Sequence, residues 1–401
     1  MAELSGVKIE KLQGGLGRKS PSTDAHIALV IEPGNNAVLG AAINNLLRGM
    51  VLTSLSQAES LGLTVSASAN SEANFYQHIS EFFRLAPEGT LYLFNDKTTV
   101  NLLAFIKNNP KIKGFAIADV DSTNAIDVVV ANYQSNIINV LAAENRLIDF
   151  GIIGYNNFSI VPNLVDLTEL DAPQISVLVA GSGVGTGGAL SNVSAVGAYL
   201  GMLAVRKVNE NVGSVNIQNK PLDKRGSADY TLTDKNKGLW VSPRLTNGAT
   251  ISSLTKAQLI ELETKGYVFA ATYEGYPGAF FTNSKTCITQ ASDYCFIENN
   301  RVWNKAARTL RMALLPEVKG VVKKDTATGF IKSTTVSRWS GIANKALEQM
   351  VSNDEISGFE VYINPQQVVS STQAVKIKAS VVMDGIVHEF EVALGLTNSL
   401  N

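Results

Sequence analysis

The chain has 401 residues, 45% of them hydrophobic and only 17% charged, so it can form more than one globular domain with a sizeable core. Its 34 basic and 35 acidic residues give a net charge of −1, which argues against nucleic acid or an anionic membrane as a partner. The two cysteines are too few for a disulfide framework. Met1–Gly6 shows no signal-peptide pattern and no apolar run reaches membrane length, so we expect a soluble protein made in a cytoplasm.

The N-terminal residues predict one strand on a flexible tether. Residues 7–12 alternate apolar and polar side chains, with Val7, Ile9 and Leu12 among the apolar ones, and a glycine-rich stretch follows at 14–17. A single strand cannot bury a face by itself. The segment is therefore either a disordered terminus or an arm that pairs elsewhere.

Residues 25–180 alternate short apolar strands with helices, a pattern typical of an α/β domain with a largely parallel sheet. The predicted strands cover residues 26–31, 91–94, 115–120, 148–153 and 175–180. The predicted helices cover residues 38–61, 71–85, 100–107, 124–145 and 189–208.

A glycine-rich loop, Gly181–Gly188, joins the last of these strands to the last helix. Strand, glycine loop and helix form the geometry that binds a phosphate at a helix N-terminus. However, no Gly-Lys-Ser/Thr sequence closes the loop, so it is not a Walker motif. We favour a connecting loop and keep a phosphate- or nucleotide-binding α/β enzyme as the alternative function.

The C-terminal part predicts two amphipathic helices followed by three strands. After a short helix from Thr255, strands are expected at 267–272 and 279–282 around a Tyr276-Pro277-Gly278 turn. A helix follows from Arg301 to Leu315, with a basic face formed by Arg301, Lys305, Arg308 and Arg311. The second helix covers residues 337–352, and the strands cover 358–365, 375–383 and 386–394. Asp384-Gly385 is the expected hairpin turn before the last strand, whose apolar residues include Phe390, Val392 and Leu394.

Catalytic arrangements are scarce. The three histidines lie far apart in the sequence and form no recognisable triad, and Cys287 and Cys295 are expected to be core thiols. Asp119, Asp121 and Asp149 lie near strand ends, where they could be catalytic or bind a metal, but we favour solvated loop ends, because strand termini in any α/β fold carry such residues. We therefore expect no catalytic, cofactor-binding or metal-binding residues.

The segment from Leu259 to Leu394 resembles the C-terminal core of contractile tail sheath proteins of bacteriophages and contractile injection systems. The resemblance lies in the order of several short motifs. They are Gly266-Tyr-Val-Phe, the Pro277-Gly278 turn, Thr289-Gln-Ala-Ser-Asp-Tyr, Ile297-Glu-Asn-Asn-Arg-Val-Trp-Asn and Ile356-Ser-Gly-Phe-Glu-Val. Ser194-Ala-Val-Gly-Ala-Tyr-Leu-Gly and Leu239-Trp-Val-Ser-Pro are similar to motifs that precede this core. The family's Trp-Gly-Ala-Arg-Thr run is replaced here by Phe280-Phe-Thr-Asn-Ser-Lys-Thr.

The resemblance implies a sheath subunit that polymerises helically around an inner tube and contracts to drive the tube through a target cell envelope. It implies stacked rings of identical subunits, with an inner tail tube protein and baseplate and tail terminator proteins as partners. Assembly is expected in the bacterial host cytoplasm, and the product is a virion tail or an injection particle. Neither enzymatic activity, a cofactor nor membrane insertion is implied.

We therefore expect an α/β fold with an α+β sheath core built from both chain ends. The expected parts are an arm at 1–24, an inserted outer α/β domain at 25–255, the core at 256–385 and a C-terminal strand arm at 386–401. The resemblance implies that the arms add strands to neighbouring subunits, and we expect the contacts to be made by Val7, Ile9 and Leu12 at one end and Phe390, Val392 and Leu394 at the other. The basic helix face is expected either to be solvated or to contact the tube or a neighbour.

Overall fold

The computed structural model describes residues 24–31, 49–64, 75–181, 192–370, 373–388, 390–392 and 394. The described residues divide into two compact units. The first contains those up to Arg206 together with Val212–Cys295, and the second contains Lys207–Asn211 together with those from Phe296 onward. The chain thus passes between the units three times. Residues 256–295, which we expected in the core domain, belong to the first unit.

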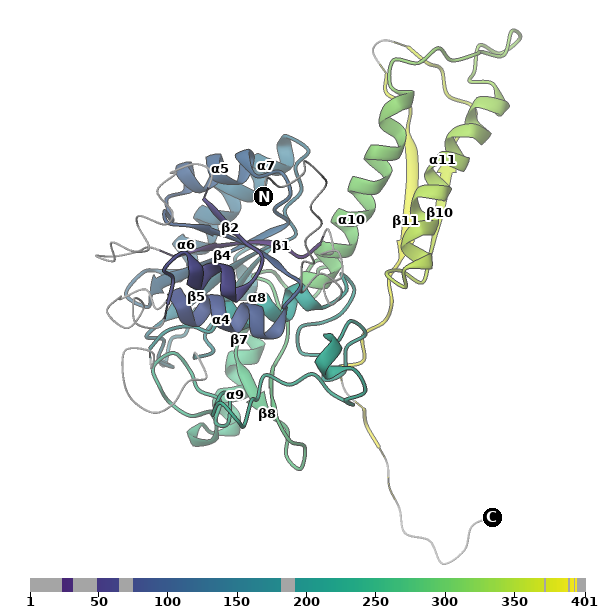
Figure 1. Ribbon diagram of the computed structural model, residues 1–401. Helices are drawn as coiled ribbons and strands as arrows, with labels where there is room; N and C mark the ends of the chain where they lie inside the picture. The colour runs from purple at the N-terminus through teal and green to yellow at the C-terminus, as the bar shows by residue number, and fades with distance from the viewer. Residues whose placement is uncertain are drawn as a thin grey trace, which may run out of the picture. The chain divides into compact units, whose positions relative to one another are not determined.

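A seven-stranded sheet forms the centre of the first unit, in the order β2-β3-β1-β4-β5-β6-β7 (Figure 1). Its strands are β1 His26–Val30, β2 Met50–Leu52, β3 Thr90–Phe94, β4 Gly114–Asp121, β5 Phe150–Asn156, β6 Ile175–Leu178 and β7 Tyr267–Val268. Neighbouring strands are parallel, except that β2 is antiparallel to β3. The expected α/β class is therefore confirmed.

Helices cover both faces of this sheet, which is why its strands are continuous apolar runs. They are α2 Leu55–Ser60, α4 Phe75–Leu85, α5 Thr99–Asn108, α6 Ile126–Tyr133, α7 Val140–Ala143, α8 Val196–Val205 and α9 Lys256–Thr264, with a π-helical stretch at Gln134–Asn139. On one face Phe105 of α5 stacks on Phe94 of β3, with ring centroids 4.3 Å apart. On the other face α8 packs between the sheet and α4.

The prediction of a helix over residues 38–61 is wrong for residues 50–52, because these residues form β2. Residues 38–48 lie outside the described part. Gly49 explains the change because its φ is +61° and a Cβ there would lie 2.4 Å from the carbonyl oxygen of Leu93. A helix cannot continue through that conformation. Helix α2 starts again after Ser54, whose hydroxyl accepts a hydrogen bond from the Gln57 N–H at 3.2 Å.

The rest of the first unit is less regular. Of the glycine loop, residues 182–188 lie outside the described part, and the helix expected at 189–208 covers only Val196–Val205. Helix α9 begins with a capping box between Thr255 and Gln258. The expected turn then separates β8 Ala270–Thr272 from β9 Ala279–Phe281, which pair as an antiparallel hairpin.

The second unit contains α10 Ile297–Leu314, α11 Ser333–Ser352, β10 Gly358–Ile363 and β11 Ile377–Val382. The two helices pack against each other, and the antiparallel β10–β11 pair packs on α11 (Figure 1). A two-stranded sheet is marginal on its own, so this packing stabilises it. The cluster that holds the unit together comprises Val208, Val302, Ala306, Leu347, Met350 and Ile356.

The third C-terminal strand, expected at 386–394, is not formed. No described residue after Val382 belongs to a strand, and Asp384-Gly385 makes no hairpin. The apolar side chains of this segment do not pack against their own unit, since Phe390, Val392 and Leu394 are 82%, 79% and 92% exposed.

Candidate assembly surface

The N-terminal half of α10 is buried among polar groups of the segment Lys207–Asn211. Val208 enters the apolar cluster, and the Asn211 amide donates to Glu298 Oε1 at 2.7 Å. An Arg301 guanidinium nitrogen donates to the Lys207 carbonyl oxygen at 3.2 Å. Charged side chains are almost never this buried unless they are bonded. This segment is therefore part of the second unit's core, although its neighbours in sequence belong to the first.

The expected basic face of α10 is only partly correct. Arg301 is 1% exposed, and Lys305 forms an ion pair with Glu355 at 2.5 Å, so neither is available to a partner. Arg308 is half-buried and Arg311 is exposed. Trp303 on the same helix is 50% exposed. The helix starts at Ile297 rather than at Arg301, and its first two turns lie in the core.

The β10–β11 pair presents one polar face and two open edges. Phe359, Val361 and Ile363 of β10 alternate inward, whereas Glu360 and Tyr362 point outward. Lys378 and Ser380 of β11 lie opposite these two residues and complete a shallow hollow of about 120 Å³. No other strand among the described residues pairs with either one. Unpaired strand edges are sites where another chain can add a strand.

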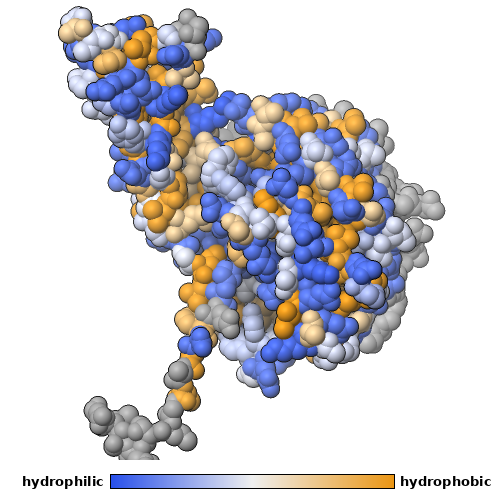
Figure 2. All heavy atoms as spheres, turned by 180° about the vertical axis from the view of Figure 1, so that it is seen from behind, coloured by the Kyte–Doolittle hydropathy of each residue, from blue (hydrophilic) through white to orange (hydrophobic). Residues whose placement is uncertain are grey.

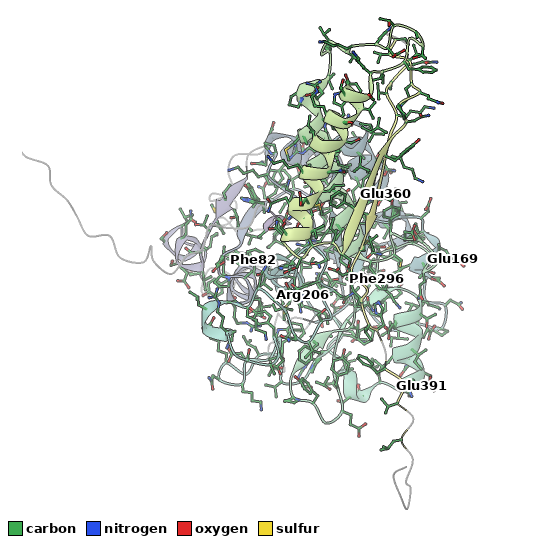
Figure 3. The ribbon with its side chains drawn as sticks, turned by 90° about the vertical axis from the view of Figure 1, so that its right-hand side faces the viewer. Phe82, Glu169, Arg206, Phe296, Glu360 and Glu391 are labelled. Carbon is green, nitrogen blue, oxygen red and sulfur yellow. The ribbon has the colours of Figure 1, made fainter. Side chains whose placement is uncertain are left out.

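The C-terminal segment is the most exposed apolar part of the described chain. Apolar residues alternate with polar ones along it, as Figure 2 shows, and Figure 3 labels Glu391 within it and Glu360 on β10. Of the expected contact residues, Phe390, Val392 and Leu394 lie here without a strand partner. Val7, Ile9 and Leu12 lie outside the described residues, so their role stays a prediction.

Of the carboxylates considered for catalysis, Asp121 and Asp149 lie at opposite ends of the β4–β5 pair. Asp121 accepts a hydrogen bond from the Thr123 N–H at 2.9 Å and another from the Asn157 amide, and these bonds lower the pKa of its carboxyl. Asp149 is buried, and the side chain of Asp119 lies outside the described part. Asp121 thus holds a turn together.

Neither a metal site nor a membrane span is found in the described ranges. No group of three or more His, Cys, Asp or Glu residues there could hold a metal ion. No helix in these ranges is both long and apolar enough to cross a bilayer. Cys287 and Cys295 are both buried, and burial raises the pKa of the Cys287 thiol, so it stays protonated.

Solved structures of contractile particles contain chains with this fold. A chain of the anti-feeding prophage (AFP) baseplate, 6-fold symmetrised, matches with a TM-score of 0.58 at 15% identity, covering 100% of both chains. A chain of an extracellular contractile injection system, the PVC sheath complex in its contracted state, matches with a TM-score of 0.57 at 13% identity, covering 100% of this chain and 98% of that one. A chain of the AFP baseplate in its contracted state matches with a TM-score of 0.55 at 12% identity, covering 99% of both. These likenesses confirm the fold that the resemblance implied.

Family models account for nearly the whole sequence. The model described as DUF2586, N-terminal domain matches residues 4–285, and the model described as DUF2586, C-terminal domain matches residues 293–401. No curated protein matches the chain. The chain therefore belongs to the DUF2586 family and shares its fold with chains of contractile injection particles.

Proposed function

We propose that this protein is the subunit of a contractile tail sheath, which polymerises helically around an inner tube and contracts to drive the tube through a target cell envelope. The observation that carries the proposal is a fold shared over the full length with chains of contractile particles, one of them from a sheath complex. The low charge of the chain also suits a building block that buries much of its surface in an assembly.

Neighbouring subunits are linked by strand addition. The C-terminal segment of one copy pairs with the open edge of β10 or β11 in the next, and Phe390, Val392 and Leu394 cover apolar surface there. The support is the combination of an exposed, alternating segment with a two-stranded sheet that has free edges. Such a contact joins two different surfaces, so its repetition produces a helix or a ring instead of a closed pair. The N-terminal strand around Val7 and Ile9 makes a second link.

Contraction is a rigid-body rearrangement of subunits whose links stay intact. The energy is stored during assembly, so the sheath subunit needs neither a nucleotide nor catalysis. Its partners are further copies in stacked rings, an inner tail tube protein, and baseplate and terminator proteins. Within the basic face of α10, Arg311 is the exposed residue that contacts an acidic tube or neighbour. Assembly takes place in the bacterial cytoplasm and the product is a virion tail or an injection particle.

Negative-stain electron microscopy of the full chain, purified alone and with a co-expressed tube protein, tests this function. We expect hollow cylinders or stacked cogwheel-shaped rings. A protein that stays monomeric in both preparations and binds ATP, GTP or NAD with micromolar affinity in isothermal titration would instead support the alternative, a nucleotide-binding enzyme that uses Gly181–Gly188.

A further inference from the structure

The start of the C-terminal segment, residues 383–388, is held in place although it forms no strand. Both carboxylate oxygens of Asp384 are hydrogen-bonded: the Ser357 hydroxyl donates to Oδ1 at 2.5 Å, and the Asn209 amide donates to Oδ2 at 2.6 Å. Hydrogen bonds to an ionised acceptor are among the stronger ones in proteins. Asp384 is therefore an anchor and not the turn residue that its Asp-Gly sequence suggests.

Two further contacts lie on either side of this anchor. Met383 packs against the apolar cluster that includes Val208 and Met350. The His388 ring stacks on Phe296, with centroids 5.0 Å apart and an interplanar angle of 21°. Phe296, labelled in Figure 3, is the residue before the first turn of α10, so its stack with His388 ties the segment to the N-terminus of that helix.

Asn209 links this anchor to the rest of the second unit. Its amide nitrogen donates to the Asp354 carbonyl oxygen at 3.0 Å as well as to Asp384. Lys207, two residues earlier, donates to the Asn353 carbonyl oxygen at 2.9 Å. The segment Lys207–Asn211 therefore holds both the loop that precedes β10 and Asp384, two residues after the end of β11.

We propose that Asn209, Asp384, Phe296 and His388 form an exit clamp, which fixes the position and direction in which the C-terminal segment leaves its subunit and so positions it for the neighbouring copy. The positioning role rests on the proposed strand addition. The clamp itself does not, because all its contacts lie within one chain. Beyond it, Phe390 and Leu394 are exposed, so the boundary between held and free chain lies close to residue 388.

The position at which the segment leaves its subunit matters because a strand that is added to a neighbouring sheet must pair in a single register. A shift by one residue would turn Phe390 and Val392 to the wrong face of the neighbouring sheet. A segment held at its start also loses less conformational entropy when it binds. The clamp should therefore speed assembly without contributing any contact across the subunit interface.

Spin labels on the full-length protein measure the clamp directly. Val387→Cys places the label inside the clamp at a position that is 63% exposed, and Leu394→Cys places a matched control label beyond it. Both native cysteines are buried, which favours selective labelling.

We expect an immobilised spectrum at 387 and a mobile one at 394. Asn209→Ala, Asp384→Ala and His388→Ala should each make the 387 spectrum more mobile and leave the 394 spectrum unchanged. Asn209→Ala is the sharpest variant, because it changes no residue of the segment.

Assembly of the same variants, without labels, tests the positioning role. Asn209→Ala and Asp384→Ala should lower the rate of sheath assembly, and Lys345→Ala, which removes an exposed charge on α11 outside both the clamp and the C-terminal segment, should not. A 387 label that is already mobile in the otherwise unchanged protein would overturn the clamp, whatever the protein's function. Normal assembly by clamp variants with a mobile 387 label would overturn the positioning role alone. If deletion of residues 386–401 also leaves assembly normal, strand addition by this segment is wrong as well.

Discussion

At the scale of single residues, His78 is the buried group with the clearest effect on stability. Its ring is enclosed by α4 and α8, and its Nδ1 accepts a hydrogen bond from the Gly197 N–H at 3.2 Å. Burial lowers the pKa of His78 to about 4. Burial, together with the nearby charges of Lys111 and Lys113, also lowers the pKa of His26. Both histidines are therefore neutral in the folded protein at neutral pH.

We predict that the free energy of unfolding falls as the pH decreases from about 6.5 to about 4. In this window the unfolded chain binds a proton at His78 and the folded chain does not, so acid favours unfolding. The shift from an ordinary value of 6.5 corresponds to a loss of about 3 kcal/mol. Urea unfolding at several pH values measures it. His78→Gln keeps a hydrogen-bond acceptor without titrating, and should flatten this part of the profile. An unchanged profile would contradict the assignment to His78.

Charge reversal at the basic residues of α10 should affect stability differently at buried and at exposed positions. Arg301→Glu places a negative charge in the core beside Glu298, so we expect a loss of about 3–5 kcal/mol of stability or failure of the second unit to fold. Arg311→Glu lies at the surface and should change stability by less than about 0.5 kcal/mol.

If Arg311 contacts an acidic tube or neighbour, Arg311→Glu should slow sheath assembly at low salt, and the difference from the unchanged protein should shrink as salt screens the charge. Light scattering follows the rate. Equal rates at low salt would mean that Arg311 is only a solvated charge.

At the scale of elements, the contact between α4 and α8 depends on two glycines of α8. A Cβ at Gly197 would lie 2.2 Å from the His78 carbonyl oxygen, and a Cβ at Gly201 would lie 2.9 Å from the Leu85 Cβ. The two helix backbones therefore touch, and α8 has no room to move because it lies against the sheet on its other side.

Gly197→Ala should destabilise the first unit by at least about 1–3 kcal/mol, because backbone atoms and not flexible side chains must shift. Gly341→Ala on α11 is the matched control. No atom lies within 4 Å of its new Cβ, so alanine there should stabilise by up to about 1 kcal/mol. Thermal melting compares the two variants. If Gly197→Ala leaves the melting temperature unchanged, α4 and α8 can move apart at little cost in free energy.

At the scale of the whole molecule, the terminal segments should govern polymerisation and not folding. The hydrogen bonds of an added strand and the burial of its apolar side chains stabilise the link between two subunits by a gross free energy on the order of 6–13 kcal/mol per arm. Association costs of roughly 4–15 kcal/mol offset most of it. A single link is therefore weak, whereas a subunit held by several neighbours is held firmly, so growth should nucleate slowly and benefit from a template.

Deletion of residues 386–401 should leave circular dichroism and melting nearly unchanged, because the removed side chains Phe390, Val392 and Leu394 are exposed. It should abolish sheath formation in electron micrographs. Deletion of residues 1–20 should do the same, as the alternating pattern at 7–12 predicts. Full-length tubes from the N-terminal deletion would show that this arm is only a disordered tail.

The sequence by itself determined the α/β class, most strands of the parallel sheet, the Pro277-Gly278 turn and the family resemblance. These features depend on local periodicity, turn residues and the order of motifs, all of which are written along the chain. The amphipathic patterns of α10 and α11 also identified both as helices, and the apolar face of α11 predicted that it packs against another element. Arg301 shows the limit of such patterns, because a cation at helical spacing looks the same whether it is solvated or buried.

Only the tertiary structure decided which of these residues meet. Arg301 is buried because a backbone carbonyl 94 positions earlier accepts its hydrogen bond. Asp384 is an anchor and not a hairpin residue because Asn209, 175 positions earlier, reaches its carboxylate. Gly49 ends a predicted helix because it approaches the backbone of Leu93. Such contacts join residues that are distant in sequence, and no local pattern encodes them.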